Sequence, residues 1–144
     1  MKIALLTPYF SPHRGGTEKY VEMLANSLVE QGDEVTVFTS QLPKNLPREE
    51  TCGNITIKRF PARELWQVPW GMRMPRKMLA GFDVVHSHGP PFNLTRFAAG
   101  IMELPHVVTY HCDVVTTPRF FGFWMPNSVC RLIDYLYSKI IRRL

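Results

Sequence analysis

Two short segments in the second half of the chain carry side chains that could do acid–base chemistry or bind a metal ion. The first is "HSHG", with His86 and His88 two residues apart, and the second is "HCD", with His111, Cys112 and Asp113 in succession. Because these residue types are all metal ligands, one hypothesis is a metal-dependent hydrolase that uses His86, His88, His111 and Asp113. Their spacing matches no closed zinc pattern, however, and clusters of this kind also serve sites without a metal.

The two segments are expected to have different roles because they lie in different sequence contexts. His86 lies within the apolar run "DVVHSH", so we expect it to form a hydrogen bond inside a sheet. His111 closes the apolar run "HVVTYH" and stands beside an acid, where a strand would open into a ligand-binding crevice. We therefore predict that His111 is the catalytic histidine.

A pair of glycines near the N-terminus predicts an anion site. Gly15 and Gly16 follow the apolar run 2–7 and precede a helical pattern over 17–31. Glycines let backbone N–H groups approach a ligand closely, and a helix N-terminus adds unpaired donors with a partial positive charge. We favour a phosphate ligand over a simple tight turn. The motifs G-x-G-x-x-G and G-x-x-x-x-G-K-[ST] do not occur, which disfavours a nicotinamide enzyme and a P-loop NTPase.

The segment 58–77 mixes aromatic with basic side chains. Trp66 and Trp70 lie among one acid, Glu64, and the basic residues Lys58, Arg59, Arg63, Arg73, Arg76 and Lys77. This mixture suits a membrane interface, and it also suits single-stranded nucleic acid. The alternative is that the tryptophans pack in the core while the basic residues face water. The candidate membrane contacts are Trp66, Trp70, Arg73, Arg76 and Lys77.

Alternating strand and helix patterns would position these residues. Strands are expected at 2–7, 34–39, 55–60, 83–88 and 106–111, and helices at 17–31, 93–102 and from Asn127 onward, with a short helix near 75–80. Residues 40–53 and 112–126 are expected to be loops, and Gly32 is expected to end the first helix. The pattern predicts an open, mostly parallel Rossmann-like α/β sheet flanked by helices, in one domain over 1–144. We also expect a truncated chain, because it ends within a helical pattern.

Composition narrows the class of partner. The formal net charge of +5 suggests an anionic partner, and the length of 144 residues suits one domain. Three cysteines without a repeated spacing are expected to be reduced thiols of a cytosolic protein. No apolar run approaches the ~18 residues of a membrane-spanning helix.

Three blocks of the sequence resemble the N-terminal, acceptor-binding domain of a GT4-type retaining GT-B glycosyltransferase. They are "MKIALLTPYFSPHRGGTEKYVEMLANSLVEQGDEVTVFTS", "FDVVHSHGP" and "VVTYHCDVV", and their order and spacing agree with the family over nearly the whole chain. The "HCD" block is similar to a His-Ser-Asp variant found in members that transfer mannose or related sugars, with Cys112 in place of the serine. The resemblance implies the N-terminal half of a two-domain fold, whose C-terminal donor domain lies outside residues 1–144.

The resemblance also implies roles for individual residues. Catalysis would fall to His111, donor-phosphate binding to Gly15, Gly16 and Thr17, and acceptor binding to Tyr9, His88 and Asp113. The partners would be a nucleotide sugar and a glycan or lipid-linked acceptor, with no metal or other cofactor and no nucleic acid. The enzyme would be cytoplasmic, with peripheral contact to the cytoplasmic membrane face, and residues 1–144 alone would not turn over. A nucleotide-sugar epimerase of the same architecture and a non-catalytic binding module remain open alternatives.

Overall fold

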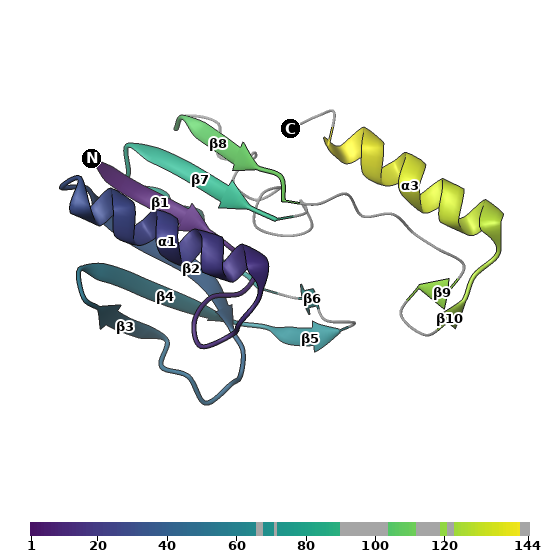
Figure 1. The fold of residues 1–144 in the computed structure, drawn as a ribbon, viewed down its shortest axis with the longest axis horizontal. Helices are drawn as coiled ribbons and strands as arrows, with labels where there is room; N and C mark the ends of the chain where they lie inside the picture. Colours follow the sequence, from purple (N-terminus) through teal and green to yellow (C-terminus); the bar gives the residue numbers. More distant parts are fainter. Residues whose placement is uncertain (66–67, 71, 90–103, 112–118, 121–122, 142–144) are drawn as a thin grey trace. The chain divides into compact units, whose positions relative to one another are not determined.

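The computed structural model describes residues 1–65, 68–70, 72–89, 104–111, 119–120 and 123–141. The chain divides into two compact units, Met1–His111 and Cys112–Leu144, which we describe separately. Figure 1 shows the sheet of the first unit and the helix that ends the second.

In the described part of the first unit, six strands form one sheet in the order β3-β4-β2-β1-β7-β8 (Figure 1). The strands are β1 (Lys2–Leu6), β2 (Glu34–Gln41), β3 (Glu49–Cys52), β4 (Ile55–Pro61), β7 (Val84–His88) and β8 (His106–Thr109). All neighbouring strands pair in parallel except β3, which pairs antiparallel with β4. The predicted open, mostly parallel sheet is therefore confirmed.

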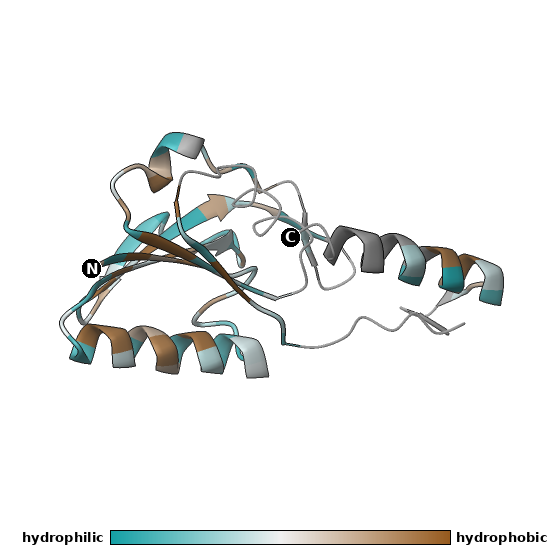
Figure 2. Ribbon diagram, turned by 90° about the horizontal axis from the view of Figure 1, so that it is seen from above, coloured by the Kyte–Doolittle hydropathy of each residue, from teal (hydrophilic) through white to brown (hydrophobic). Residues whose placement is uncertain are grey.

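The central strands carry apolar side chains on both faces, because both faces of the sheet are covered. On one face, α1 (Gly16–Glu30) packs Val21 and Ala25 into a core with β1, β2 and β4. On the other face, Met74 and Leu79, in and just before the 3₁₀ helix η1 (Arg76–Leu79), pack against Phe38 of β2 and against β1 and β7. Figure 2 shows α1 and η1 on opposite sides of the hydrophobic central strands.

The first helix ends where the sequence predicts. Gly32 has a φ of 90°, which suits glycine, and its N–H donates to the Val29 carbonyl at 2.9 Å. The next N–H, from Asp33, donates to the Leu28 carbonyl at 3.1 Å. These bonds satisfy carbonyl groups that a helix end otherwise leaves unpaired, and the chain turns directly into β2.

The expectation of a loop over 40–53 is wrong for its last part, because Glu49–Cys52 forms β3. This edge strand is polar and mostly exposed, so it lacks the apolar pattern that identifies a strand. It is defined instead by its pairing with β4, including an ion pair between Lys58 and Glu49 at 3.2 Å. Consequently β4 is an interior strand, with β3 on one side and β2 on the other.

Short hairpins account for two other differences. The strands β5 (Arg63–Leu65) and β6 (Val68–Trp70) pair antiparallel in a segment for which no strand is expected. In the second unit, β9 (Arg119–Phe120) pairs with β10 (Phe123–Trp124) inside the expected loop 112–126. Strands of two or three residues are too short to show a hydrophobic period.

The second unit ends in α3 (Asn127–Ile141), which begins at Asn127 as predicted. The Pro126 carbonyl accepts the N–H of Cys130 at 3.2 Å. Among the described residues, none of the helices is both long and apolar enough to cross a bilayer. The helix expected over 93–102 lies outside the described residues.

Candidate functional site

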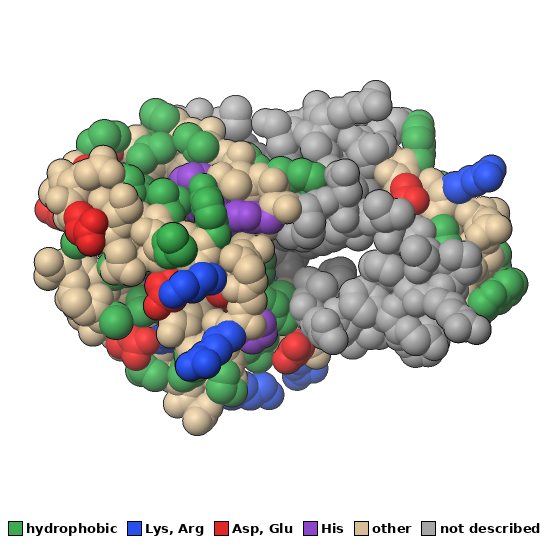
Figure 3. All heavy atoms as spheres, viewed as in Figure 1, with side chains coloured by type: hydrophobic (Ala, Val, Ile, Leu, Met, Phe, Trp, Pro, Cys, Tyr) green, Lys and Arg blue, Asp and Glu red, His purple; other side chains and the backbone are tan. Residues whose placement is uncertain are grey.

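The carboxyl ends of β1, β7 and β8 bring two of the predicted site residues together. His88 is the last residue of β7, and the parallel register places it opposite Thr109, two residues before His111. The ring nitrogens His88 Nδ1 and His111 Nε2 lie 3.3 Å apart. Over the ends of β7 and β8, histidine side chains reach the surface among hydrophobic ones (Figure 3). This is the edge at which open α/β sheets bind ligands.

Tyr20 of α1 is a third member of this cluster, and sequence reasoning missed it. Its ring meets the His111 ring edge-on at a centroid distance of 5.0 Å and lies 5.9 Å from the His88 ring. The side chain is exposed, unlike the apolar stripe of the same helix. Tyr20 could have been predicted from its position four residues after Gly16, because residues four apart lie on the same side of a helix.

His86 takes the structural role that the sequence predicts. Its Nε2 lies 2.7 Å from the Thr109 hydroxyl, so it forms a hydrogen bond between β7 and β8. A second cross-strand pair joins the Ser87 hydroxyl to His106 Nε2 at 2.8 Å. These two bonds join β7, which ends at His88, to β8, which precedes His111.

Burial keeps the histidines of this cluster neutral. It lowers the pKa of His88 to about 3, with smaller repulsive effects from His86 and His111. Burial also lowers the pKa of His111, partly offset by the Glu18 carboxylate, which raises it. The same direction holds for His86, again chiefly through burial. At neutral pH the site therefore offers uncharged imidazoles, which donate one hydrogen bond and accept another.

The glycine pair occupies the start of α1, as expected. Gly15 is the N-cap residue in an extended conformation, and its carbonyl accepts the Lys19 N–H at 3.1 Å. A Cβ on Gly15 would overlap the Glu18 carboxylate, whereas a Cβ on Gly16 would meet no atom within 4 Å. The backbone at Gly16 is thus open to a ligand, and the phosphate site at Gly15, Gly16 and Thr17 stays a prediction.

An acidic side chain lies at this helix start. Glu18 is in the first turn of α1, and its carboxylate lies 3.6 Å from His13 Nδ1. A carboxylate is stabilised here by the positive end of the helix dipole. A bound phosphate would experience repulsion from Glu18 at short range, unless that side chain turns away.

Tyr9 lines the loop between β1 and the glycine pair. Its side chain is buried and stacks on the His13 ring at a centroid distance of 4.3 Å. The hydroxyl makes no direct hydrogen bond within the described part of the chain. Burial, together with the nearby Glu64 carboxylate, raises the pKa of Tyr9 to about 12, so the phenol stays protonated.

Arg59 also contacts the loop between β1 and the glycine pair. Its side chain is 1% exposed and donates from Nη2 to the Ser11 carbonyl at 2.8 Å and to Glu50 Oε1 at 2.6 Å. Nη1 donates to the Pro47 carbonyl at 3.3 Å. The assignment of Arg59 to a basic surface is therefore wrong, because the alternation of β4 places it on the same face as the buried Ile55 and Ile57, while Lys58 is partly exposed on the other face.

Part of the predicted membrane surface can be located. Arg73 and Lys77 are exposed, which is compatible with contact to an anionic surface. Trp66 lies outside the described residues, as do the side chains of Trp70 and Arg76. Cys112 and Asp113 also lie outside them. Membrane contact stays a prediction.

Metal binding gains no support from the described residues. They contain no group of three or more histidine, cysteine or acidic side chains placed to hold a metal ion. His88 and His111 direct ring nitrogens at each other across 3.3 Å. Asp113, the acidic member of the hydrolase hypothesis, is outside the described part of the chain.

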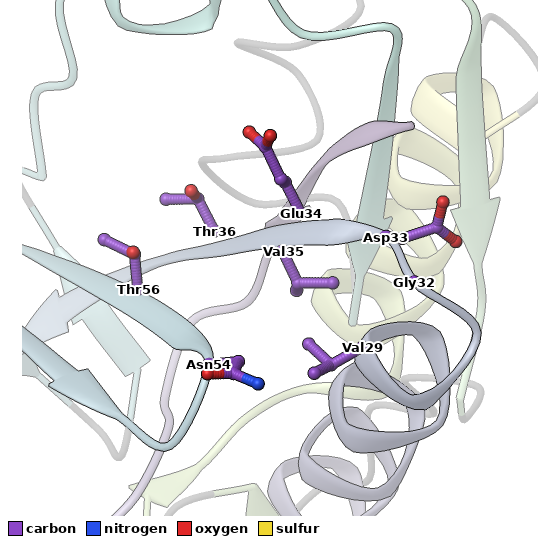
Figure 4. A pocket seen from close by; sticks show the side chains of 8 residues that line it. All are labelled: Val29, Gly32, Asp33, Glu34, Val35, Thr36, Asn54 and Thr56. Atoms are coloured by element: carbon purple, nitrogen blue, oxygen red, sulfur yellow. The ribbon is translucent and has the colours of Figure 1, made fainter.

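An open hollow of about 380 Å³ lies at the opposite edge of the sheet, where β2 and β4 begin (Figure 4). Its lining contains neither histidine nor a basic side chain and consists of Val29, Gly32, Asp33, Glu34, Val35, Thr36, Asn54 and Thr56. Because ligands of open α/β sheets bind at the carboxyl edge, we place the candidate site at the histidines instead.

Fold and sequence together define the class of this protein. The structure is similar to that of sucrose-phosphate synthase from Thermosynechococcus elongatus, with a TM-score of 0.58 and 17% identity over 94% of this chain and 39% of that chain. A second structure of that synthase gives a TM-score of 0.51 and 15% identity, covering 98% of this chain and 99% of that one. These similarities establish a fold of the GT-B glycosyltransferase type.

The family follows from the sequence. The family model for Glycosyltransferase Family 4 matches residues 14–144, so the chain belongs to that family. No curated protein sequence matches the chain. The chain spans 39% of the length of the first synthase structure.

Proposed function

We propose that this chain is the acceptor-binding half of a retaining glycosyltransferase, which moves a sugar from a nucleotide-sugar donor to a glycan or lipid-linked acceptor. Family membership supports glycosyl transfer in general. The assignment to the acceptor-binding half of a retaining enzyme is supported by one observation. His88, His111 and the helix start at Gly15–Gly16 all lie at the carboxyl edge of the same, mostly parallel sheet.

His111 is the proposed catalytic residue. It is half-buried, so its ring can touch a ligand while its pKa stays lowered by burial. A neutral imidazole can donate a hydrogen bond to a sugar hydroxyl and orient the sugar for transfer. Such a contact also stabilises charge that develops in the transition state.

Gly15, Gly16 and Thr17 are the proposed contacts for the donor diphosphate. Both glycines are exposed, and the helix N-terminus favours negative charge. In this proposal the helix dipole and basic side chains stabilise the diphosphate, so no metal is required. The nucleotide would be held mainly by a C-terminal donor domain, a proposal supported by the chain's spanning 39% of the synthase structure.

Acceptor binding is assigned more narrowly than the resemblance implies. His88 is 1% exposed, which argues against direct contact with an acceptor. Tyr9, at 8% exposure, keeps a small accessible area and remains a proposed acceptor contact together with Asp113. A lipid-linked acceptor would bring the enzyme to the cytoplasmic membrane face, where Trp66, Trp70, Arg73, Arg76 and Lys77 would make peripheral contact.

The test is sugar transfer by the longest protein that the gene encodes around residues 1–144. It is incubated with a panel of nucleotide sugars and with lipid and glycan acceptors, and the anomeric configuration of the product is determined by NMR. We expect transfer with retained configuration, and His111→Ala should lower turnover by ~100-fold, the usual loss for a transition-state contact. Products formed without an acceptor would favour an epimerase instead. A loss below about threefold would remove His111 from catalysis.

A further inference from the structure

The least accessible side chain of the histidine cluster has one specific partner. His88 is 1% exposed, and its Nδ1 lies 3.3 Å from Nε2 of the half-buried His111. Its other ring nitrogen, Nε2, is buried and has no hydrogen-bond partner among the described residues. The His86 ring packs 4.1 Å from it, centroid to centroid, and the Tyr20 ring 5.9 Å. His88 thus contacts the proposed catalytic residue while being closed off from solvent.

Only two arrangements of hydrogens are compatible with this geometry, because each neutral imidazole carries one N–H. In the first, His88 Nδ1–H donates to His111 Nε2, which leaves the His111 hydrogen on Nδ1. In the second, His111 Nε2–H donates to His88 Nδ1, which leaves an N–H on His88 Nε2. That second N–H would be buried without an acceptor in the described part of the chain. Unpaired buried N–H groups are rarer than unpaired acceptors, so the first arrangement is favoured.

We propose that His88 is a positioning residue that holds His111 in the tautomer with hydrogen on Nδ1, so that His111 offers a hydrogen-bond donor to its ligand. The identity of that ligand, a sugar hydroxyl or an oxygen gaining negative charge, rests on the proposed function. The tautomer itself does not. In the described part of the chain His111 Nδ1 makes no hydrogen bond, which leaves this N–H for a ligand.

The direct test is the ring tautomer of His111 in the chain 1–144. Long-range ¹H–¹⁵N spectra of ¹⁵N-labelled protein at neutral pH show which ring nitrogen carries the hydrogen. We expect the Nδ1–H form at His111. A predominantly Nε2–H form, which is the form that a free imidazole side chain prefers in water, would overturn the proposal. This measurement needs no variant and no activity.

Two variants then test whether His88 is the cause. His88→Phe keeps a ring in place but removes both nitrogens, so His111 should change to the Nε2–H form. His88→Asn keeps a donor close to the position of Nδ1, so His111 should retain the Nδ1–H form. Thr109→Val is the matched control, because it removes the hydrogen bond of His86 from the same pair of strands and should leave His111 unchanged. An equal response of His111 to His88→Phe and His88→Asn would show that packing sets the tautomer, which contradicts the proposal.

Failure of this inference and failure of the proposed function can be told apart. In a protein that transfers sugar, His88→Phe should lower kcat by at least about tenfold with little change in KM, and His88→Asn should restore part of it. If the wild-type protein transfers sugar normally but His111 is in the Nε2–H form, only the positioning role of His88 is contradicted. If His111 is in the Nδ1–H form but the protein transfers no sugar, the positioning role is retained and the proposed enzymatic function is contradicted.

Discussion

Lowering the pH should destabilise the first unit through His88, and replacing His88 should remove a defined part of that effect. The pKa of this histidine is about 3 in the folded protein and 6.5 in its unperturbed state. Between these two values the unfolded chain binds a proton that the folded chain does not, so the free energy of unfolding falls as pH falls. The sign is the one expected for a buried base whose folded pKa is depressed.

The size of the effect follows from the two pKa values. At about pH 4.5 the unfolded state gains roughly 2–3 kcal/mol from protonation of this one side chain, compared with about pH 8. The pKa values of His86, His106 and His111 are also lowered by burial, so the wild-type protein should lose more than this. The difference between wild type and His88→Asn isolates the contribution of His88, because the other histidines are common to both.

The assay is urea unfolding of the chain 1–144 at several pH values, followed by circular dichroism. We expect the free energy of unfolding to decline more steeply for wild type than for His88→Asn, with a difference of about 2–3 kcal/mol between pH 8 and pH 4.5. Tyr20→Phe is the control, because it alters the same cluster and keeps every histidine. Parallel declines for wild type and His88→Asn would refute the reasoning, since they would mean that His88 titrates equally in both states.

Three further predictions concern the glycine loop and its support. Gly16→Ala should leave stability unchanged or raise it by up to ~1 kcal/mol, because alanine favours helices, yet weaken pyrophosphate binding about tenfold in an NMR titration; unchanged binding would place the anion elsewhere. Glu18→Gln should tighten pyrophosphate binding a few-fold by removing a nearby negative charge, measured by the same titration, and weaker binding would contradict the repulsion argued for this side chain. Arg59→Met should cost about 3 kcal/mol in urea unfolding, because it removes the hydrogen bonds from Arg59 to Ser11, Pro47 and Glu50. The neighbouring Lys58→Met, which breaks an exposed ion pair, should cost under about 1 kcal/mol, and equal losses would show that the Arg59 contacts contribute little.

The elements that carry a clear apolar period could be predicted from the sequence. The strands β1, β2, β7 and β8 and the helices α1 and α3 lie where their patterns indicate. For β1 and α1 the physical reason is visible, because the strand is buried beyond its first residue and the helix buries Val21 and Ala25 on one face. The polar edge strand β3 could not be predicted, since its position depends on pairing with β4 rather than on burial.

The candidate site was predictable in part. His111, His88 and the glycine pair could be assigned to strand ends and to a helix start, which meet at one edge of a parallel sheet. The burial of His88 and its bond to His111 depend on the register between β7 and β8, which no local pattern encodes. Tyr20 joins the cluster because the first turns of α1 lie at the same end of the sheet. Arg59 turns inward because the alternation of β4 places it on the same face as the buried Ile55 and Ile57.

The most direct test of the central claim is to locate where a nucleoside diphosphate binds. A ¹⁵N-labelled chain 1–144 is titrated with the diphosphate at millimolar concentration, and backbone amide shifts are followed residue by residue. We expect shifts at Gly15, Gly16, Thr17 and His111, at the carboxyl edge of the sheet. Shifts confined to Val35, Thr36 and Thr56 at the opposite edge would contradict this placement of the site.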